Sequence, residues 1–183
     1  GPGLLHERLL ISDELRHAVQ IKGDPRDRFM QQVRSAAALL DGGNIKQLDS
    51  IISSMESAAQ EMNASAYSWY PIAFRAMRAL MRGDLNLAEK LGMEYSTVGR
   101  KSGDVNVLAE RACHFCMISV EKCEADIAVD HAAHFTTQFP GVRAWTAGAA
   151  MLNLHAGRVR VAVETLNTFD SHETRRLFHE LGG

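Results

Sequence analysis

The stretch from Gly83 to Leu91 reads GDLNLAEKL, and the stretch from Gly43 to Ile51 reads GNIKQLDSI. A third stretch, from Gly157 to Leu166, follows the same plan with GRVRVAVETL. Each begins with glycine, which readily takes the left-handed geometry that ends a helix, and continues with a polar residue, as helix N-termini prefer. An apolar residue and a small residue follow, as expected where two helices cross closely. The same helix–turn–helix unit is therefore predicted at three places.

The turns form two interleaved series along the chain. One series falls near residues 43, 83, 123 and 157, with spacings of 40, 40 and 34 residues. The other falls near residues 23, 63, 103 and 140, with spacings of 40, 40 and 37 residues. A shared period of this length is typical of a helix pair repeated about four times. The turn at Cys123 departs from the pattern, because it has no glycine.

Apolar residues recur at helical spacing almost everywhere, as at Tyr70, Phe74, Met77 and Met81. Such a stripe predicts a helix with one buried face, and no alternating pattern typical of strands interrupts it. We therefore expect an all-α fold, an α-solenoid of tetratricopeptide-like helix pairs. The expected helices are residues 4–20, 26–41, 45–62, 66–82, 85–101, 105–121, 125–138, 142–156, 159–168 and 172–181. The last would begin a fifth unit, and an uncapped end of such a stack favours self-association.

Length and composition limit the classes of protein to consider. The 183 residues suit one domain, and 46% hydrophobic with 23% charged residues is typical of a globular chain. A net charge of −2 lacks the basic excess of a nucleic-acid-binding domain, so no direct nucleic-acid partner is expected. The longest uncharged stretches are too short for a membrane span, so no membrane partner is expected either. Cys113, Cys116 and Cys123 are odd in number and close together, which indicates reduced thiols and a cytoplasmic location.

The chain opens with Gly1-Pro2-Gly3, which resembles the remnant of a removed affinity tag. We expect residues 4–183 to form a single helical-repeat domain excised from a larger protein.

The sequence resembles the tetratricopeptide-like repeat region of large bacterial ATP-binding transcriptional regulators, over roughly residues 23–169. The resemblance rests on the spacing of Trp69-Tyr70, Arg75-Ala76, Ala79-Leu80, Gly83-Asp84, Ala88-Glu89 and Gly103-Asp104, and on the run Phe139-Pro140-Gly141-Val142-Arg143-Ala144-Trp145 followed by Leu152 and Gly157-Arg158. In that family the repeats follow a signal-transduction ATPase module, and some members also carry a LuxR-type, winged-helix or cyclase domain. The resemblance implies an interaction or sensing module and no enzyme, since the phosphate-binding loop motif is not in this chain.

Metal binding is the first chemistry to weigh. Cys113 and Cys116 share a helix face and could meet His131 and His134 from the next helix at a zinc ion. Their neighbours are apolar, however, and free cysteine is among the most buried residue types. We therefore expect core cysteines and no metal or other cofactor.

Catalysis finds no support in the sequence. The serines lack the glycine-flanked turn of a nucleophilic serine, and the sequence places Cys113 neither at a helix N-terminus nor in a basic pocket that would activate its thiol. Carboxylate pairs such as Asp126 and Asp130 are expected on solvated helix faces. The eight methionines are expected mainly as core filling.

Arginine is the polar feature that points to binding. Arg75, Arg78 and Arg82 have helical spacing along the first helix of a unit, opposite its apolar stripe. The first helices of the other units carry Arg34, Arg111, His114 and Arg143. First helices line the concave face of such a stack, so Arg75, Arg78, Arg82, Arg111, His114 and Arg143 are the candidate site. A groove of this kind would bind acidic peptide, carboxylate or phosphate groups. The alternative is a solvated face in which the arginines pair with Asp84 or Glu89.

Three functions remain open at this point. The leading one is a sensing or protein-interaction module of a bacterial regulator or signalling ATPase, whose partner would be a protein, an effector or the ATPase domain of the same chain. A second is a free-standing adaptor that binds a peptide in trans. A third is a small-molecule sensor that holds its ligand near Trp69, Tyr70 and Trp145.

Overall fold

The computed structural model describes residues 24–63, 65–104, 106–139 and 142–168, together with residues 7, 10, 11 and 14. The described residues contain helices and no strand, which confirms the predicted all-α class for this part of the chain. The helices are α2 (Pro25–Asp41), α3 (Ile45–Glu61), α4 (Trp69–Met81), α5 (Leu85–Ser102), α6 (Asn106–Glu121), α7 (Ala125–Gln138), α8 (Arg143–His155) and α9 (Val159–Leu166), and the 3-10 turn η1 (Ser65–Tyr67) precedes α4. Of the helix expected at 4–20, residues 7, 10, 11 and 14 are described and helical, whereas the helix expected at 172–181 lies outside the described residues. No described helix is both long and apolar enough to cross a lipid bilayer.

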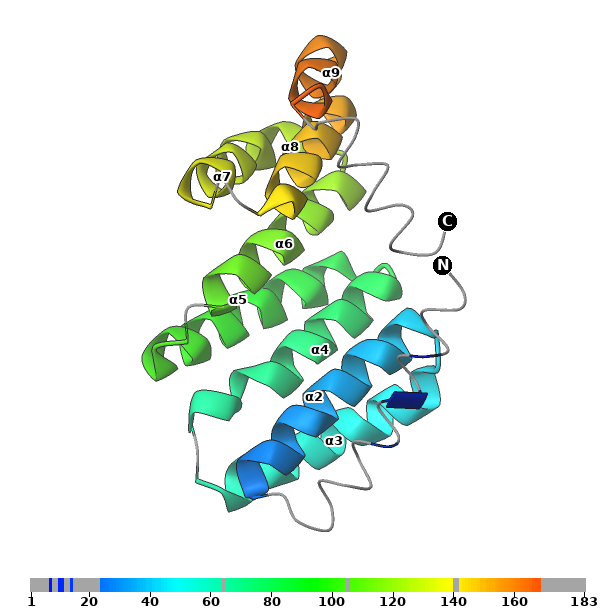
Figure 1. The fold of residues 1–183 in the computed structure, drawn as a ribbon, viewed down its shortest axis with the longest axis vertical. Coiled ribbons are helices and arrows are strands. Elements are labelled where there is room, and N and C mark those ends of the chain that lie inside the picture. Colours follow the sequence, from blue (N-terminus) through cyan, green and yellow to red (C-terminus); the bar gives the residue numbers. More distant parts are fainter. Residues whose placement is uncertain are drawn as a thin grey trace.

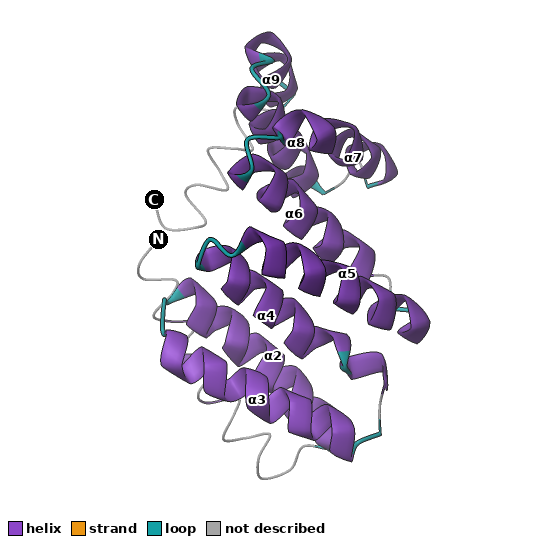
Figure 2. Cartoon of the chain, turned by 180° about the vertical axis from the view of Figure 1, so that it is seen from behind, coloured by secondary structure: helices purple, strands orange, loops and turns teal. Residues whose placement is uncertain are grey.

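The helices follow one another along the long axis of the molecule, from α2 and α3 at one end to α9 at the other (Figure 1). Each helix packs mainly against the next one in the chain, and α4 also contacts α6 as α6 contacts α8. The same order is visible from behind (Figure 2). The chain therefore builds its core from neighbouring helices, in separate clusters along the axis.

The turns after α2, α4, α6 and α8 share one geometry. The second residue after each of these helices has a positive φ, between 58° and 75°, at Gly43, Gly83, Cys123 and Gly157. In each turn the next N–H donates to a carbonyl five residues earlier, as Asn44 does to Leu39 at 3.0 Å and Glu124 does to Ser119 at 2.8 Å. This hydrogen bond satisfies a carbonyl that the end of the helix leaves without a partner. Cys123 thus adopts the glycine geometry although it carries a side chain.

Side-chain caps then start the following helices. The Asn44 carboxamide accepts a hydrogen bond from the Gln47 N–H, and the Asp84 carboxylate accepts one from the Leu87 N–H at 3.1 Å. Asp24 does the same for α2. These caps explain why a polar residue directly after the glycine marks a helix start at α3 and α5.

The start of α4 differs from the expected helix at 66–82. Residues 65–67 form the 3-10 turn η1, and the α-helix begins at Trp69. Pro71 explains this, because proline has no N–H and its ring clashes with the carbonyl four residues earlier. Proline is tolerated in the first turn of a helix, so α4 begins just before it.

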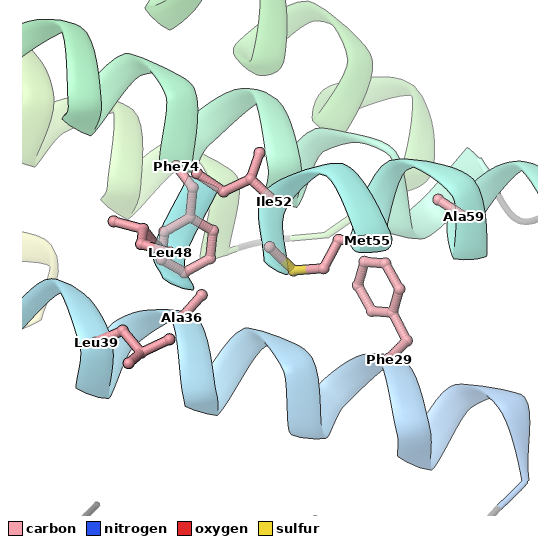
Figure 3. Packing of buried hydrophobic residues seen from close by; sticks show 8 residues of the cluster. All are labelled: Phe29, Ala36, Leu39, Leu48, Ile52, Met55, Ala59 and Phe74. Carbon is pink, nitrogen blue, oxygen red and sulfur yellow. The ribbon is translucent and has the colours of Figure 1, made fainter. Parts of the chain in front are cut away.

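The clusters of the core differ in side-chain size. At one end, Phe29, Ala36 and Leu39 of α2 face Leu48, Ile52, Met55 and Ala59 of α3, and Phe74 of α4 completes the cluster (Figure 3). The cluster of α6, α7 and α8 is instead mostly small, with Cys116, Ala125, Ala128, Val129, Ala132, Ala149 and Leu152. Small side chains fill less space, so this is the part of the stack where a hollow can remain.

Candidate binding sites

The first candidate site is the arginine row on α4. Arg78 is bound to Asp49 of α3 through two hydrogen bonds, from Nε at 2.9 Å and from the terminal nitrogen at 3.3 Å. Its side chain is only 11% exposed, and the hydrogen bond from Arg78 holds the pKa of Asp49 below its usual value. Arg75 is bound to Glu56 of α3 at 2.7 Å. Both ion pairs therefore fasten α4 to α3.

The alternative prediction, that Asp84 or Glu89 pairs with the arginines of α4, is wrong. Asp84 caps α5, and Glu89 binds the Lys122 ammonium at 2.6 Å. The reason is the packing of α4 on α3, which brings Asp49 and Glu56 to the arginines from far away in the sequence.

Arg75, Arg78 and Arg82 do line one cavity, of about 400 Å³. The rest of its wall comes from the second helices of two units, namely Asp49, Ile52 and Ser53 of α3 and Leu87 and Leu91 of α5. The described lining contains none of Arg111, His114 and Arg143, so the six expected residues do not form a single site. Arg82 is exposed at one end of the row.

His114 lies inside the protein and cannot meet a partner. It is 5% exposed, and its Nδ1 is 2.9 Å from the Tyr95 hydroxyl of α5. Burial, assisted by the charge of Arg111, lowers the pKa of His114 to about 4. Its Nε2 lies 3.7 Å from a carboxylate oxygen of Glu110, whose own pKa is raised by burial. The expectation of His114 on an open concave face is therefore wrong, because the aromatic core between α5 and α6 encloses it.

Arg111 and Arg143 have separate surroundings. The Arg111 guanidinium lies 5.7 Å from the centre of the Phe115 ring, and it also fills the space beside Gly92 of α5. An added Cβ at Gly92 would lie 3.2 Å from an Arg111 nitrogen, so the glycine makes room for this side chain. Arg143 is half-buried and is the first residue of α8.

A second cavity, of about 480 Å³, lies between α6 and α8. From α6 it is lined by Asn106, Ala109, Cys113, Cys116 and Met117. From α8 it is lined by Ala144, Trp145, Gly148, Met151 and Leu152, and Ala132, Phe139 and Val142 complete the described wall. None of these described lining residues carries a formal charge. We call it the α6–α8 cavity.

The three aromatic residues proposed for a small-molecule site, Trp69, Tyr70 and Trp145, lie in two different parts of the structure. Trp145 lines the α6–α8 cavity and stacks on Phe135 of α7, with ring centres 4.6 Å apart. Trp69 is buried, stacks on Tyr70 at 3.9 Å, and donates from its indole nitrogen to Asp104 at 3.3 Å. Trp69 is thus a core residue between α4 and α5, and the half-buried Tyr70 packs between Trp69 and Phe29 of α2. Neither of them joins Trp145.

The cysteines differ in exposure: Cys116 is buried, as expected of a core residue, whereas Cys113 and Cys123 are exposed. The expectation of a core position is therefore wrong for Cys113, which lies on an exposed face of α6. Cys113 and Cys116 both line the α6–α8 cavity, where partial desolvation of the thiol raises the pKa of Cys113 to about 11 and also raises that of Cys116. A protonated thiol is a poor nucleophile and a poor metal ligand. His131 packs edge-on against Phe115, and the described residues hold no cluster of three or more metal-ligating side chains.

Sequence reasoning missed the α6–α8 cavity. The signal that could have revealed it is the alanine and glycine content of the two first helices that bound it, at Ala109, Ala144 and Gly148. Such residues predict close helix packing as readily as they predict a hollow, so the pattern alone does not decide.

Comparison with known proteins gives no match: no protein-family model, no curated protein and no solved structure is similar to this chain.

Proposed function

We propose that the chain is a stack of tetratricopeptide-like helix pairs, an α-solenoid that serves as a sensing and interaction module of a larger cytoplasmic bacterial regulator. Support for the repeat comes from the four turns of shared geometry after α2, α4, α6 and α8. Turns of one kind at regular spacing are what a repeated helix pair requires.

The α6–α8 cavity is the observation that carries the sensing role. Two helices from different pairs bound it, so whatever fills it contacts both pairs at once. An occupant that prefers one arrangement of these pairs shifts the module toward that arrangement, by as much as its affinities for the two states differ. The partner that reads this shift would be the ATPase domain of the same protein.

A titration of this chain with the nucleotide-binding domain that the proposal assigns to the same protein tests the proposal. We expect binding whose affinity changes by about tenfold between the ATP-bound and nucleotide-free states, a coupling of about 1.4 kcal/mol. The matched control is the α9 variant Glu164→Gln, at an exposed position outside the cavity lining, which should leave this coupling unchanged. Absence of binding in both nucleotide states would contradict the regulator role.

The arginine cavity favours a second candidate, a free-standing adaptor that binds an acidic peptide in trans. Three arginines line a hollow of about 400 Å³, and arginine suits carboxylate groups. Two of them are already paired with Glu56 and Asp49, which leaves Arg82 to attract the peptide. Tight, salt-sensitive binding of an oligoglutamate peptide that Arg82→Glu abolishes would favour the adaptor.

A further inference from the structure

The α6–α8 cavity is of the size and chemistry that a small molecule needs. Its volume of about 480 Å³ lies within the roughly 300–1,000 Å³ of ligand pockets. Small residues in the wall, such as Ala109, Ala144 and Gly148, leave space that larger side chains would fill. A Cβ added at Gly148 would meet no atom within 4 Å.

The lining selects against charge. The described wall has no ionised side chain, and Asn106 supplies its one amide group. The cavity is partly open to solvent, since Asn106, Cys113 and Met117 in its wall are exposed. A charged group placed there would lose part of its hydration without gaining a partner of opposite charge, which is costly. The occupant that fits is therefore uncharged.

The lining also favours an aromatic ring. Trp145 and Phe139 contribute aromatic surface, and stacking on Phe135 holds Trp145 in place. Cys113, Cys116, Met117 and Met151 contribute four sulfur atoms. Sulfur makes favourable contacts with aromatic rings, and flexible methionines adapt to the shape of a ligand.

From these features we infer that the α6–α8 cavity binds an uncharged aromatic small molecule. The inference rests on the proposed sensing function and names the chemistry of its effector. A ligand in this place contacts α6, α7 and α8 together, and so it joins the third and fourth helix pairs.

A pair of fluorescent probes with the same ring system tests the inference. Phenylnaphthylamine is uncharged, and anilinonaphthalene sulfonate adds one negative charge to the same rings. We expect saturable one-to-one binding of the neutral probe, and binding about tenfold weaker for the sulfonate, because its charge would be partly desolvated with no partner of opposite charge. Equal binding of both probes, or no saturable binding of the neutral one, would overturn the inference.

Two variants locate the probe. Gly148→Leu fills the cavity and should abolish binding of the neutral probe, whereas Ala147→Leu, at the exposed neighbouring position, should leave it unchanged. Loss of binding in both variants, or in neither, would contradict the assignment. Thermal unfolding of each variant shows that it is folded.

Energy transfer gives a second readout that does not depend on filling the cavity. Excited Trp145 should transfer its energy to the bound neutral probe, and Trp145→Phe should remove most of this transfer while Trp69 remains. Transfer that survives Trp145→Phe unchanged would place the probe elsewhere. These results are independent of the ATPase-domain titration. If the neutral probe does not bind but the ATPase domain does, the ligand inference alone is overturned. If the probe binds but the ATPase domain does not, the regulator role alone is overturned.

Discussion

Single residues decide how the turns of this protein are made. Gly43, Gly83 and Gly157 take a left-handed backbone at no steric cost, whereas Cys123 takes it at φ 58° with a side chain attached. Because a Cβ in this conformation crowds the following carbonyl, the Cys123 turn stores strain that its counterparts avoid.

Cys123→Gly should therefore stabilise the protein. We expect the free energy of unfolding to rise by about 0.5–1 kcal/mol, the strain relieved less the extra entropy of glycine in the unfolded chain. Urea denaturation measures the change. Gly83→Ala is the matched control and should lose about 1 kcal/mol, since its added Cβ meets no atom within 4 Å and only the backbone at φ 74° opposes it. A Cys123→Gly protein less stable than the parent would refute this explanation.

His114 gives the protein a stability that depends on pH. Its pKa is about 4 in the folded protein and about 6.5 in the unfolded chain. Between these values the unfolded chain binds more protons, so acidification favours unfolding. When the pH is lowered from neutral to about 5, His114 should reduce the free energy of unfolding by about 2 kcal/mol. The raised pKa of Glu110 offsets part of this loss, because the folded protein then binds a proton more readily at that carboxylate.

His114→Asn removes the titrating group and can keep an acceptor for the Tyr95 hydroxyl. We expect its free energy of unfolding to fall less than that of the parent as the pH is lowered, although its stability at neutral pH is lower. Urea denaturation at neutral pH and at about pH 5 compares the two proteins. The same drop in both would assign the acid sensitivity to other groups.

At the scale of elements, two helix glycines have opposite roles. Gly99 of α5 lies against Val107 of α6, and an added Cβ would overlap the Val107 methyl groups. Gly148 of α8 borders the α6–α8 cavity and has open space beside it.

The same substitution at these two positions should have opposite effects. Gly99→Ala should destabilise the protein by about 1–3 kcal/mol through overpacking, and Val107→Ala in the same chain should recover part of the loss. Gly148→Ala should stabilise it by about 0.5–1 kcal/mol, because alanine is the better helix former. Thermal or urea unfolding measures both. Destabilisation at Gly148 would mean that the space beside it is closed.

Helix positions could largely be predicted from the sequence, because they depend on local chemistry. Glycine after α4 and aspartate before α5 are sufficient to end one helix and begin the next. The start of α4 departs from the apolar pattern because Pro71 restricts the backbone before it, so the helix begins at Trp69. The all-α class follows from the same local signals.

The contacts between helices could not be predicted in the same way. Arg78 and Asp49 are 29 residues apart, and only the packing of α4 on α3 makes them partners. The sequence does not show which face of α6 meets α5, so it does not reveal that Tyr95 of α5 receives His114 in the core. The α6–α8 cavity is likewise set by how far α6 and α8 approach, which no residue on either helix encodes alone.

At the scale of the whole molecule, the stack presents an apolar surface on α9. Val159, Val163 and Leu166 are 56%, 50% and 51% exposed. Leu166 and Ile52 occupy equivalent positions in their repeats, because each lies the same number of residues after its turn glycine, Gly157 or Gly43. Ile52 packs in a core cluster with Phe74 of the next helix. Leu166 thus occupies a place that another helix covers in the first pair.

We expect this surface to drive self-association as concentration rises. Val163→Lys combined with Leu166→Lys should reduce it, because charged side chains resist burial. Sedimentation equilibrium measures the mass over a range of concentrations. Glu164→Gln, which changes the charge of the same helix by one unit, is the control and should associate as the parent does. A parent protein that stays monomeric would show that α9 is not an association surface.

The central claim is that the α6–α8 cavity is a ligand site, and methyl NMR of the methionines tests it most directly. Met117 and Met151 line the cavity, whereas Met55 is enclosed in the cluster of α2, α3 and α4. Addition of phenylnaphthylamine should shift the methyl signals of Met117 and Met151 and leave that of Met55 in place. Unchanged signals from Met117 and Met151 at a probe concentration that saturates the fluorescence would contradict the claim.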